Sequence, residues 1–415
     1  MKICVLGLGY IGLPTALLFA QKYEVVGVDI DREVVKKINR GKVPFHEPGL
    51  ASLFEKVKNN FVAKTEVEEA DVFLIAVPTP LEKNVKVANL KYVRMAAEMI
   101  CPYLDKDNLV ILESTVPPGT SERLIIPILE RSGLKAGEFY FAYCPERALP
   151  GNTIYEMIYN DRVIGILDET SGKLAKDLYS SFVRGNICLT DLRTAEFVKL
   201  MENIYRDVNI ALANEFAQIA EESGINVWEA IELANKHPRV NILKPGPGVG
   251  GHCIAIDPWF LTESSTKSRM ISLAREINDS MPNYVLQIVR KMVGNVKDPT
   301  ITVFGVAYKG DVDDTRESPA LKFIKLAENE GFRVKVYDPY VKNFEYEIMD
   351  YKDATKDSDC MVVITDHSVF KDINPEPISK LMRRKNVLDC RNILDRKKWK
   401  MFGFNVKVLG DGKSC

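Results

Sequence analysis

The stretch that decides the fold is Lys2-Ile-Cys-Val-Leu-Gly-Leu-Gly-Tyr-Ile-Gly12, which is followed by Glu24-Val-Val-Gly-Val-Asp29. Residues 2–6 are an apolar run typical of a buried strand, residues 7–12 form a glycine-rich turn, and an apolar helix begins at Leu13. Residues 24–29 supply a second strand. The sequence therefore predicts a βαβ unit at the N-terminus.

A Gly-x-Gly-x-x-Gly turn between a strand and a helix predicts a dinucleotide site. Gly7 permits the turn, Gly9 lets a pyrophosphate approach the backbone, and Gly12 lets helix and strand pack closely. The helix N-terminus offers N–H groups to the phosphates. Asp29 ends the second strand, where a carboxylate binds the adenosine ribose hydroxyls and repels a 2′-phosphate. We therefore expect NAD; NADP is the alternative, because Arg32 is near enough to neutralise a phosphate.

Apolar strands alternate with helical segments through the first half of the chain. The candidate strands are 72–77, 109–113, 139–143 and 162–166, and 89–101 is a candidate helix. This alternation predicts an α/β fold with an N-terminal Rossmann-like, doubly wound parallel sheet.

The pattern changes to long helices in the middle of the chain, over 191–222 and 268–294. Further strand candidates follow at 300–305, 333–338, 360–364 and 386–390, with a helix at 318–330. They predict a second, smaller Rossmann-like α/β domain. The expected domains are 1–190 for the cofactor, 191–295 for a central helical, dimer-forming region, and 296–415 for a C-terminal α/β domain.

The composition is that of an ordinary globular protein. The 415 residues include 56 basic and 57 acidic side chains, so the net charge of -1 gives no electrostatic case for nucleic acid or a membrane surface. No apolar run is long enough to span a bilayer, and the chain opens directly on a strand, which predicts a cytoplasmic protein without a signal peptide. The eight cysteines form no CxxC pair and the four histidines have no ligand spacing, so we expect no metal and mostly buried thiols.

A second glycine-rich segment, Gly246-Pro-Gly-Val-Gly-Gly-His-Cys-Ile-Ala-Ile-Asp-Pro-Trp-Phe260, fixes Cys253 four residues before Asp257. We expect the glycines to keep the surroundings of the thiol open. A nucleophilic thiol in a chain that binds NAD suggests oxidation of an alcohol past the aldehyde to an acid. The alternatives are a small residue in a tight loop for Cys253, and a packing role rather than general-base catalysis for His252.

Lys199, Asn203 and Arg206 share one face of the long helix, where a lysine and an amide could stabilise a developing oxyanion. A solvated polar face is the alternative. Other polar residues stand at predicted strand ends or loop edges, where open α/β sheets bind ligands. They are Thr79, Thr115, Glu146, Arg147, Lys309, Arg316 and Arg391. The cations among them suit an anionic substrate such as a nucleoside diphosphate.

Together these stretches resemble the UDP-sugar 6-dehydrogenase family, also called the UDP-glucose/GDP-mannose dehydrogenase family, over nearly the whole chain. The motifs are Tyr143-Cys-Pro-Glu-Arg147, Asn160-Asp-Arg-Val-Ile-Gly165, Asn226-Val-Trp228, His237-Pro-Arg-Val-Asn-Ile-Leu243 and the segment 248–260. The resemblance implies a homodimer or higher homo-oligomer built on the central helix. It also implies NAD-dependent, four-electron oxidation at C6 of UDP-N-acetyl-D-mannosamine.

The resemblance also implies roles for individual residues. Cys253 would be the covalent nucleophile, Lys199 and Asn203 the oxyanion-stabilising pair, Asp257 and Thr115 the holders of the water, and Glu146 its activator. The implied substrate contacts are Arg147, Ala148, Lys199, Asn203, Arg206, His237, Arg239, Gly250, Tyr308 and Lys309. The implied NAD contacts are Gly7, Gly9, Tyr10, Ile11, Gly12, Asp29, Thr79, Thr115, Arg316 and Arg391.

Three departures from the UDP-glucose members of that family bear on the substrate. His252 stands where they have serine, Val249 where they have phenylalanine and Pro150 where they have a second glutamate, which disfavours glucose. UDP-N-acetylglucosamine stays an alternative, because the C2 epimer does not follow from these residues. The other classes left open are a one-step alcohol dehydrogenase and a nucleotide-sugar binding protein without catalysis.

Overall fold

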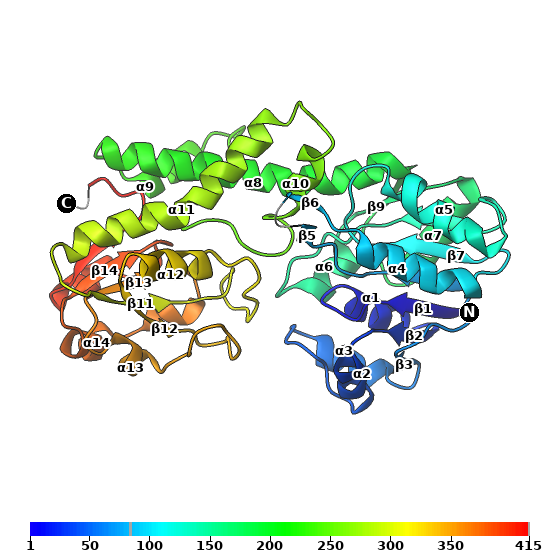
Figure 1. The fold of residues 1–415 in the computed structure, drawn as a ribbon, viewed down its shortest axis with the longest axis horizontal. Coiled ribbons are helices and arrows are strands. Elements are labelled where there is room, and N and C mark those ends of the chain that lie inside the picture. The colour runs from blue at the N-terminus through cyan, green and yellow to red at the C-terminus, as the bar shows by residue number, and fades with distance from the viewer. Residues whose placement is uncertain (83–84, 414–415) are drawn as a thin grey trace. The chain divides into compact units, whose positions relative to one another are not determined.

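The computed structural model describes residues 1–82 and 85–413 (Figure 1). The chain divides into two compact units, the first comprising residues 1–202 and 259–264 and the second residues 203–258 and 265–415. Cys415, one of the eight cysteines counted above, lies outside the described residues.

The first unit contains an eight-stranded sheet in the order β10-β9-β8-β7-β4-β1-β2-β3. Its strands are β1 (Lys2–Leu6), β2 (Glu24–Val28), β3 (Phe61–Lys64), β4 (Val72–Ile75), β7 (Leu109–Leu112), β8 (Tyr140–Tyr143), β9 (Arg162–Ile166) and β10 (Ile187–Asp191). All six strands predicted for this half of the chain are present, within two residues of the expected bounds. The α/β fold with a large, mainly parallel sheet is therefore confirmed.

The direction of two strands differs from the prediction. β8 and β9 pair antiparallel, with Ala142 opposite Ile166 and Tyr143 opposite Gly165, and β10 runs parallel to β9. The expectation of a wholly parallel sheet is therefore wrong for β9 and β10. The connection through α6 (Thr153–Tyr159) returns the chain to the end of the sheet where β8 stops, so β9 must run back against β8.

Helices cover both faces of this sheet, which explains why its central strands are apolar without alternation. Ile3 and Val5 of β1 face a core shared with α1 (Gly12–Phe19), α2 (Arg32–Asn39), α3 (Leu50–Val57) and α7 (Glu169–Tyr179). Cys4 and Leu6 face a second core shared with α4 (Lys91–Ile100) and α5 (Ile126–Leu129). A short hairpin of β5 (Leu81–Glu82) and β6 (Val87–Ala88) pairs antiparallel outside the large sheet.

The long helix predicted over 191–222 is α8 (Leu192–Glu222), which supplies residues to both units. It begins directly after Asp191, the last residue of β10, and the Asp191 carboxylate accepts a hydrogen bond from the Thr194 N–H at 2.9 Å. A Cβ on Gly165 of β9 would lie 2.8 Å from the Ala195 Cβ. Only glycine therefore lets the first turn of α8 pack this closely on the sheet.

The second unit contains a five-stranded parallel sheet in the order β12-β11-β13-β14-β15. Its strands are β11 (Thr300–Phe304), β12 (Arg333–Tyr337), β13 (Cys360–Val363), β14 (Asn386–Asp389) and β15 (Asn405–Val408). Four of them were predicted. The second α/β unit is thus confirmed.

The remaining helices of the second unit pack around this sheet and along α8 (Figure 1). They are α9 (Val227–Ala234), α11 (Arg269–Val293), α12 (Pro319–Asn329), α13 (Tyr351–Thr355), α14 (Pro375–Leu381) and α15 (Arg396–Met401). α10 (Asp257–Thr262) straddles the division between the units. Across 1–82 and 85–413, no helix combines the length and apolar character that crossing a membrane requires.

Candidate active site

The three glycines of the first turn have different surroundings. Gly7 has φ +93°, and a Cβ there would lie 2.5 Å from the Ala76 carbonyl oxygen. A Cβ on Gly12 would lie 1.9 Å from the Gly7 carbonyl oxygen, whereas a Cβ on Gly9 would meet no atom within 4 Å. The first and third glycines are therefore needed for packing, and the second leaves open space beside the backbone. This arrangement fits a pyrophosphate approaching at Gly9.

Asp29 is held beside this turn. It follows β2 directly, is half-buried, and accepts hydrogen bonds from the Leu8 N–H at 2.9 Å and the Asp31 N–H at 2.9 Å. A carboxylate in this position can still accept from ribose hydroxyls. Of the other expected NAD contacts, the ring of Tyr10 packs on that of Phe45 with 4.2 Å between centroids. Ile11 is the N-cap residue of α1, and Thr79 is buried.

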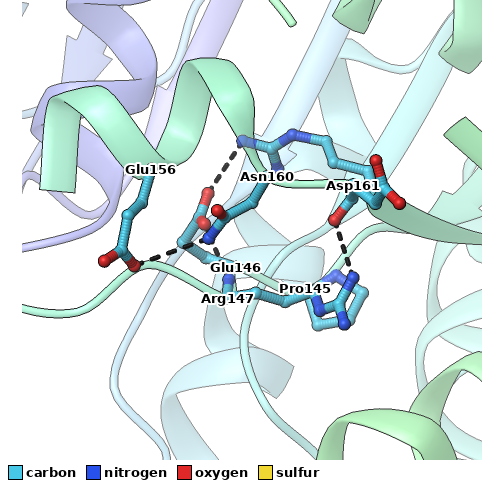
Figure 2. A pocket seen from close by; sticks show the side chains of 7 residues that line it. Pro145, Glu146, Arg147, Glu156, Asn160 and Asp161 are labelled. Carbon is cyan, nitrogen blue, oxygen red and sulfur yellow. Dashed lines mark hydrogen bonds and ion pairs between the residues drawn. The ribbon is translucent and has the colours of Figure 1, made fainter. Parts of the chain in front are cut away.

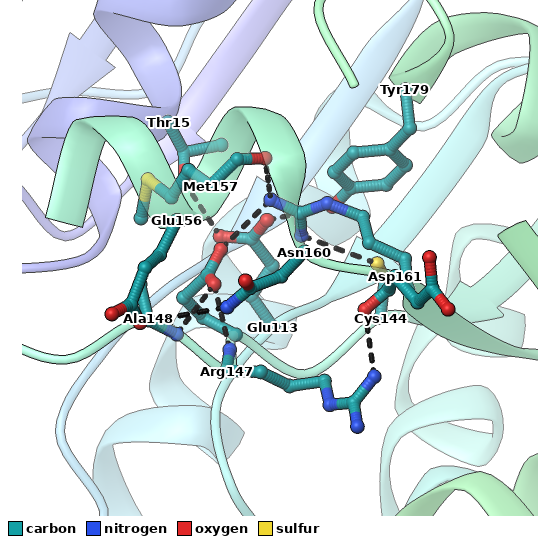
Figure 3. A network of polar contacts seen from close by, with 12 residues as sticks. Thr15, Glu113, Cys144, Arg147, Ala148, Glu156, Met157, Asn160, Asp161 and Tyr179 are labelled. Atoms are coloured by element: carbon teal, nitrogen blue, oxygen red, sulfur yellow. Dashed lines mark hydrogen bonds and ion pairs between the residues drawn. The ribbon is translucent and has the colours of Figure 1, made fainter. Parts of the chain in front are cut away.

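A buried polar network lies at the ends of β7 and β8 (Figure 3). The Glu113 carboxylate accepts hydrogen bonds from the Tyr179 hydroxyl at 2.6 Å and the Thr15 hydroxyl at 3.1 Å. Burial raises the pKa of Glu113 to about 7, against the opposing effect of the nearby Arg162 guanidinium. Burial likewise raises the pKa of Cys144 to about 12, so this thiol is inert.

Glu146 and Arg162 form the ion pair at the centre of this network. Arg162 Nη2 lies 2.9 Å from Glu146 Oε2, and Glu146 Oε1 accepts from the N–H groups of Arg147 at 2.6 Å and Ala148 at 2.9 Å. A small pocket beside this pair is lined by Pro145, Glu146, Arg147, Glu156, Asn160, Asp161 and Arg162 (Figure 2). In this arrangement the Glu146 carboxylate fixes the turn that follows β8.

Lys199 is directed at the same turn. Its side chain is 7% exposed and its Nζ donates to the main-chain oxygen of Glu146 at 2.5 Å. Arg147 pairs with Glu202, one turn further along α8, at 2.6 Å, and donates to the Asp161 carbonyl oxygen at 2.7 Å. The first unit therefore brings together Lys199, Glu146, Arg147 and Ala148, all named from the sequence. Thr115 is half-buried after β7.

The second unit brings together Asn203, Arg206 and Asp257. The Asn203 amide donates to the Asp257 carboxylate and its carbonyl oxygen accepts from Arg206. Asn203 is fully buried and Asp257 is 3% exposed. The Asp257 N–H donates to the Cys253 carbonyl oxygen at 2.8 Å, while the Cys253 side chain is exposed. The four residues from Cys253 to Asp257 thus form one helical turn. Through this turn and the Asp257 carboxylate, the loop that carries the thiol is connected to the Asn203 amide on α8.

The glycines around Cys253 do not keep its surroundings open, so that part of the prediction is wrong. A Cβ on Gly250 would lie 2.7 Å from the Glu317 carbonyl oxygen, and a Cβ on Gly251 would lie 2.8 Å from the Tyr308 ring. These glycines are needed because the loop packs tightly on the segment 308–319. Cys253 is accessible from its other side. Burial lowers the pKa of His252, which favours its neutral form.

The cations of the second unit are partly used within the fold. The Arg316 guanidinium forms three hydrogen bonds with the Asp314 carboxylate, at 3.0, 3.1 and 2.6 Å. Arg391 donates to the Ile364 carbonyl oxygen at 2.9 Å, and a Cβ on Gly246 would lie 2.7 Å from its guanidinium. His237 and Arg239 are exposed beyond α9, where the Arg239 N–H donates to His237 Nδ1 at 3.3 Å.

Several residues that shape the site were not predicted. Arg162, the partner of Glu146, appeared only inside a family motif; an arginine opening an otherwise apolar strand was the available signal. Asn214 of α8 accepts from the Gly246 N–H at 2.8 Å and donates to Asn278 of α11 at 2.8 Å, and nothing in the sequence marks it. Over the described ranges, no group of three or more His, Cys, Asp or Glu side chains is arranged to hold a metal ion.

The glycine turn, the acid after β2 and the two α/β units define an NAD-binding dehydrogenase as the class. Residues 1–183 match the NAD binding domain of the UDP-glucose/GDP-mannose dehydrogenase family, residues 193–280 its central domain and residues 302–396 its UDP binding domain. The chain belongs to the UDP-glucose/GDP-mannose dehydrogenase family.

Individual relatives match along the whole chain. The UDP-N-acetyl-D-mannosamine dehydrogenase of Methanococcus aeolicus is 52% identical over 423 residues, covering 100% of this chain and 96% of the relative. A solved structure of the UDP-D-ManNAc dehydrogenase of Pyrococcus horikoshii has a TM-score of 0.94 at 44% identity and covers 100% of both chains. The UDP-N-acetyl-mannosamine dehydrogenase of Staphylococcus aureus has a TM-score of 0.90 at 41% identity, covering 99% of this chain and 98% of that one.

Proposed function

We propose that this protein oxidises the C6 hydroxyl of UDP-N-acetyl-D-mannosamine to the carboxylate of UDP-N-acetyl-D-mannosaminuronate. Support comes from the full-length similarity to proteins named as UDP-N-acetyl-D-mannosamine dehydrogenases. The observation that carries the chemistry is the exposed thiol of Cys253 on a loop whose Asp257 is hydrogen-bonded to Asn203. A one-step alcohol oxidation needs no thiol, whereas in oxidation to an acid a thiol can hold the aldehyde for the second hydride transfer.

NAD, when bound, accepts one hydride in each of the two oxidations, so two molecules are reduced for each sugar. Between these oxidations the Cys253 sulfur adds to the C6 aldehyde, forming a C–S bond. The second oxidation leaves a thioester. Water then adds to the thioester carbon and the C–S bond breaks, which releases the carboxylate and restores the thiol.

The chain's own polar groups support these steps. We assign Lys199 and Asn203 to the oxygen that gains negative charge at C6, because an ammonium and an amide are hydrogen-bond donors to an oxyanion. Asp257 and Thr115 are assigned to the attacking water. Glu146 is assigned to activation of that water. Glu146 also bonds to Arg162 and to two backbone N–H groups, and these bonds support a second role, in which Glu146 positions the turn whose main-chain oxygen accepts from Lys199.

NAD fits the residues of the first unit. Gly9 leaves room for the pyrophosphate, and Asp29 offers the ribose a carboxylate that disfavours a 2′-phosphate. The further residues that we assign to NAD are Gly7, Tyr10, Ile11, Gly12, Thr79, Thr115, Arg316 and Arg391. Those that we assign to the UDP-sugar are Arg147, Ala148, Lys199, Asn203, Arg206, His237, Arg239, Gly250, Tyr308 and Lys309.

We further propose a homodimer formed by the central region, residues 191–295, with the cofactor domain at 1–190 and the UDP domain at 296–415. Support comes from apolar side chains spaced three, four or seven residues apart on α8 that are exposed in one chain. They are Met201 (52% exposed), Tyr205 (58%), Leu212 (42%), Phe216 (38%) and Ile219 (52%). A second copy of α8 would cover this stripe. The cytoplasmic location stays a prediction from the sequence.

The test is a substrate panel with NAD, scored as NADH formed per sugar. UDP-N-acetyl-D-mannosamine should yield two NADH, and UDP-N-acetylglucosamine and UDP-glucose much less. Cys253→Ala should stop turnover at or before the aldehyde, and the matched variant Cys188→Ala, at another exposed cysteine, should behave as wild type. One NADH per sugar would indicate a one-step alcohol dehydrogenase. UDP-sugar binding without any NADH would indicate a binding protein.

A further inference from the structure

The second sheet begins with the same backbone arrangement as the first. Gly305 follows β11 as Gly7 follows β1, and both have positive φ, +86° and +93°. The Gly7 N–H donates to the Val28 carbonyl oxygen at the end of β2 at 2.8 Å, and the Gly305 N–H donates to the Tyr337 carbonyl oxygen at the end of β12 at 2.8 Å. The segment after Gly305 therefore corresponds to the dinucleotide turn of the first unit.

The acid after the second strand is also repeated. Asp29 follows β2 and accepts from the Leu8 N–H at 2.9 Å; Asp338 follows β12 and accepts from the Val306 N–H at 2.7 Å. Asp29 is half-buried, but Asp338 is 4% exposed and its other oxygen accepts from two backbone N–H groups of the following turn. In the second unit the Asp338 carboxylate is therefore buried and already hydrogen-bonded, so it is not available to ribose hydroxyls.

His367 is the residue that closes it. The ring is fully buried, with Nε2 3.0 Å from Asp338 Oδ2 and Nδ1 2.9 Å from the main-chain nitrogen of Asp311. A backbone N–H can only donate, so Nδ1 accepts and the proton of the neutral ring is on Nε2, facing Asp338. Burial alone would raise the pKa of Asp338, but the bonds from His367 and from backbone N–H groups hold it below its usual range.

The segment between these two contacts, residues 306–311, carries Tyr308 and Lys309. Its first residue is tied to Asp338 and its last to His367. Thr365, two residues before His367, donates to the Ala307 carbonyl oxygen at 2.7 Å. The Asp311 carboxylate in turn accepts from the Ser368 N–H at 2.8 Å. The segment 306–311 is thus held at its start by Asp338 and at its end by residues of the segment 365–368.

We propose that His367 and Asp338 are positioning residues for the nucleotide site, holding the segment 306–311 so that Tyr308 and Lys309 can bind the UDP moiety. This rests on the proposed role of those two residues in the UDP-sugar site. The acid that would bind a ribose in the first unit serves here as an internal anchor. The same βαβ start therefore places a half-buried carboxylate that can bind a ligand in one unit and a buried carboxylate that anchors a loop in the other.

The experiment compares three variants of the full-length protein by calorimetric titration with UDP and by steady-state kinetics. His367→Gln can place its amide N–H where Nε2 faces Asp338, but its amide oxygen then does not occupy the Nδ1 position that accepts from the Asp311 N–H. This variant should bind UDP about tenfold more weakly, the effect of one lost buried hydrogen bond. The KM for the UDP-sugar should rise with kcat and the KM for NAD unchanged. His367→Asn restores an acceptor near the Nδ1 position and should recover part of the UDP affinity.

Thr302→Val is the matched control, because it removes a different buried hydrogen bond of the same sheet, from the Thr302 hydroxyl to the Ala354 carbonyl oxygen. It should lower the melting temperature without changing UDP affinity. Wild-type UDP affinity in His367→Gln, or equal loss in His367→Gln and Thr302→Val, would overturn the proposal, as would a wild-type protein that does not bind UDP. Because titration with UDP needs no turnover, absence of NADH with every UDP-sugar would count against the proposed function alone.

Discussion

Glu146 Oε2 and Arg162 Nη2 lie 2.9 Å apart, with side chains only 5% and 4% exposed, on the two sides of the junction where the sheet changes direction. The antiparallel register of β8 and β9 continues to this pair, since Tyr143 stands opposite Gly165. The main-chain oxygen of Glu146 is also the acceptor for Lys199. Because β9 runs antiparallel to β8, its first residue, Arg162, lies beside the turn that follows β8. There it pairs with Glu146, whose main-chain oxygen binds Lys199.

Arg162→Met should destabilise the protein by about 3–5 kcal/mol, because it leaves the Glu146 carboxylate buried without its cation. The measurement is urea unfolding, with NADH formation as a second readout that should fall as the acceptor of Lys199 shifts. Arg193→Met removes the exposed pair with Glu122 and should cost less than about 1 kcal/mol. Equal losses in the two variants would show that the buried pair is not a support.

Gly9→Ala and Gly12→Ala should separate cofactor binding from folding. A Cβ at Gly9 enters open space, so this variant should unfold as wild type but bind NAD at least about tenfold more weakly, because the methyl group occupies the pyrophosphate path. A Cβ at Gly12 meets the Gly7 carbonyl oxygen, so that variant should lose stability first. Thermal unfolding and NAD titration measure the two effects. Unchanged NAD affinity in Gly9→Ala would contradict the assignment of the turn.

Glu113 should make stability depend on pH in one direction. Its pKa is raised from 4.5 to about 7, so the folded protein binds this proton more tightly than the unfolded chain does. Its contribution is complete below pH 4.5 and is lost as the pH rises through about 7, a difference of about 3 kcal/mol. Glu113→Gln keeps the shape of the side chain without the titration.

Urea midpoints of wild type and Glu113→Gln measured from pH 5 to pH 8 test this. The variant should gain stability relative to wild type as the pH rises, since its amide does not lose a proton. The groups that face Glu113 are Thr15, Tyr179, Arg162 and Glu146, and all are retained in the variant. A difference that is constant over this pH range would mean that Glu113 is ionised throughout.

The cysteines should differ in their reaction with iodoacetamide under native conditions. Cys253 and Cys188 are exposed and should be alkylated, while Cys4, Cys144, Cys360 and Cys390 are buried and should react only after unfolding. Saturating UDP and NAD should protect Cys253 but leave Cys188 reactive. Mass spectrometry of the alkylated peptides measures both. Protection of Cys188 to the same extent would mean that the ligands act through general stabilisation.

The fold was predictable where burial is continuous. β4 is buried along its whole length and β1 at every residue after Lys2, and such runs stand out in any sequence. β3 and β10 were missed because they lie at the two edges of the sheet, where two residues of β3 and no residue of β10 are buried. The direction of β9 was not predictable either, since an apolar run of five residues carries no sign of the strand it pairs with.

The site was predictable where its residues are close in sequence. Asn203 and Arg206 were grouped by helical spacing, and the structure joins them directly. Asp257 and Asn203 were given separate roles in one active site through the family resemblance, and their hydrogen bond was not predicted, because 54 residues separate them. Arg162 and His367 were not identified as support residues, since their roles depend on partners in other strands and on complete burial.

No residue lies between β10 and α8, so the position of Lys199 depends on the strand that precedes its helix. A strand that continues directly into a helix has no flexible loop at the junction. The orientation of α8, and with it the position of the Lys199 ammonium group, is therefore set by the sheet. A larger residue in place of Gly165, which is 34 positions before Lys199, would collide with Ala195 in the first turn of the helix. The helix would tilt, and the ammonium group would move away from its acceptor. Activity in this enzyme can therefore be lost through a residue that touches neither sugar nor cofactor.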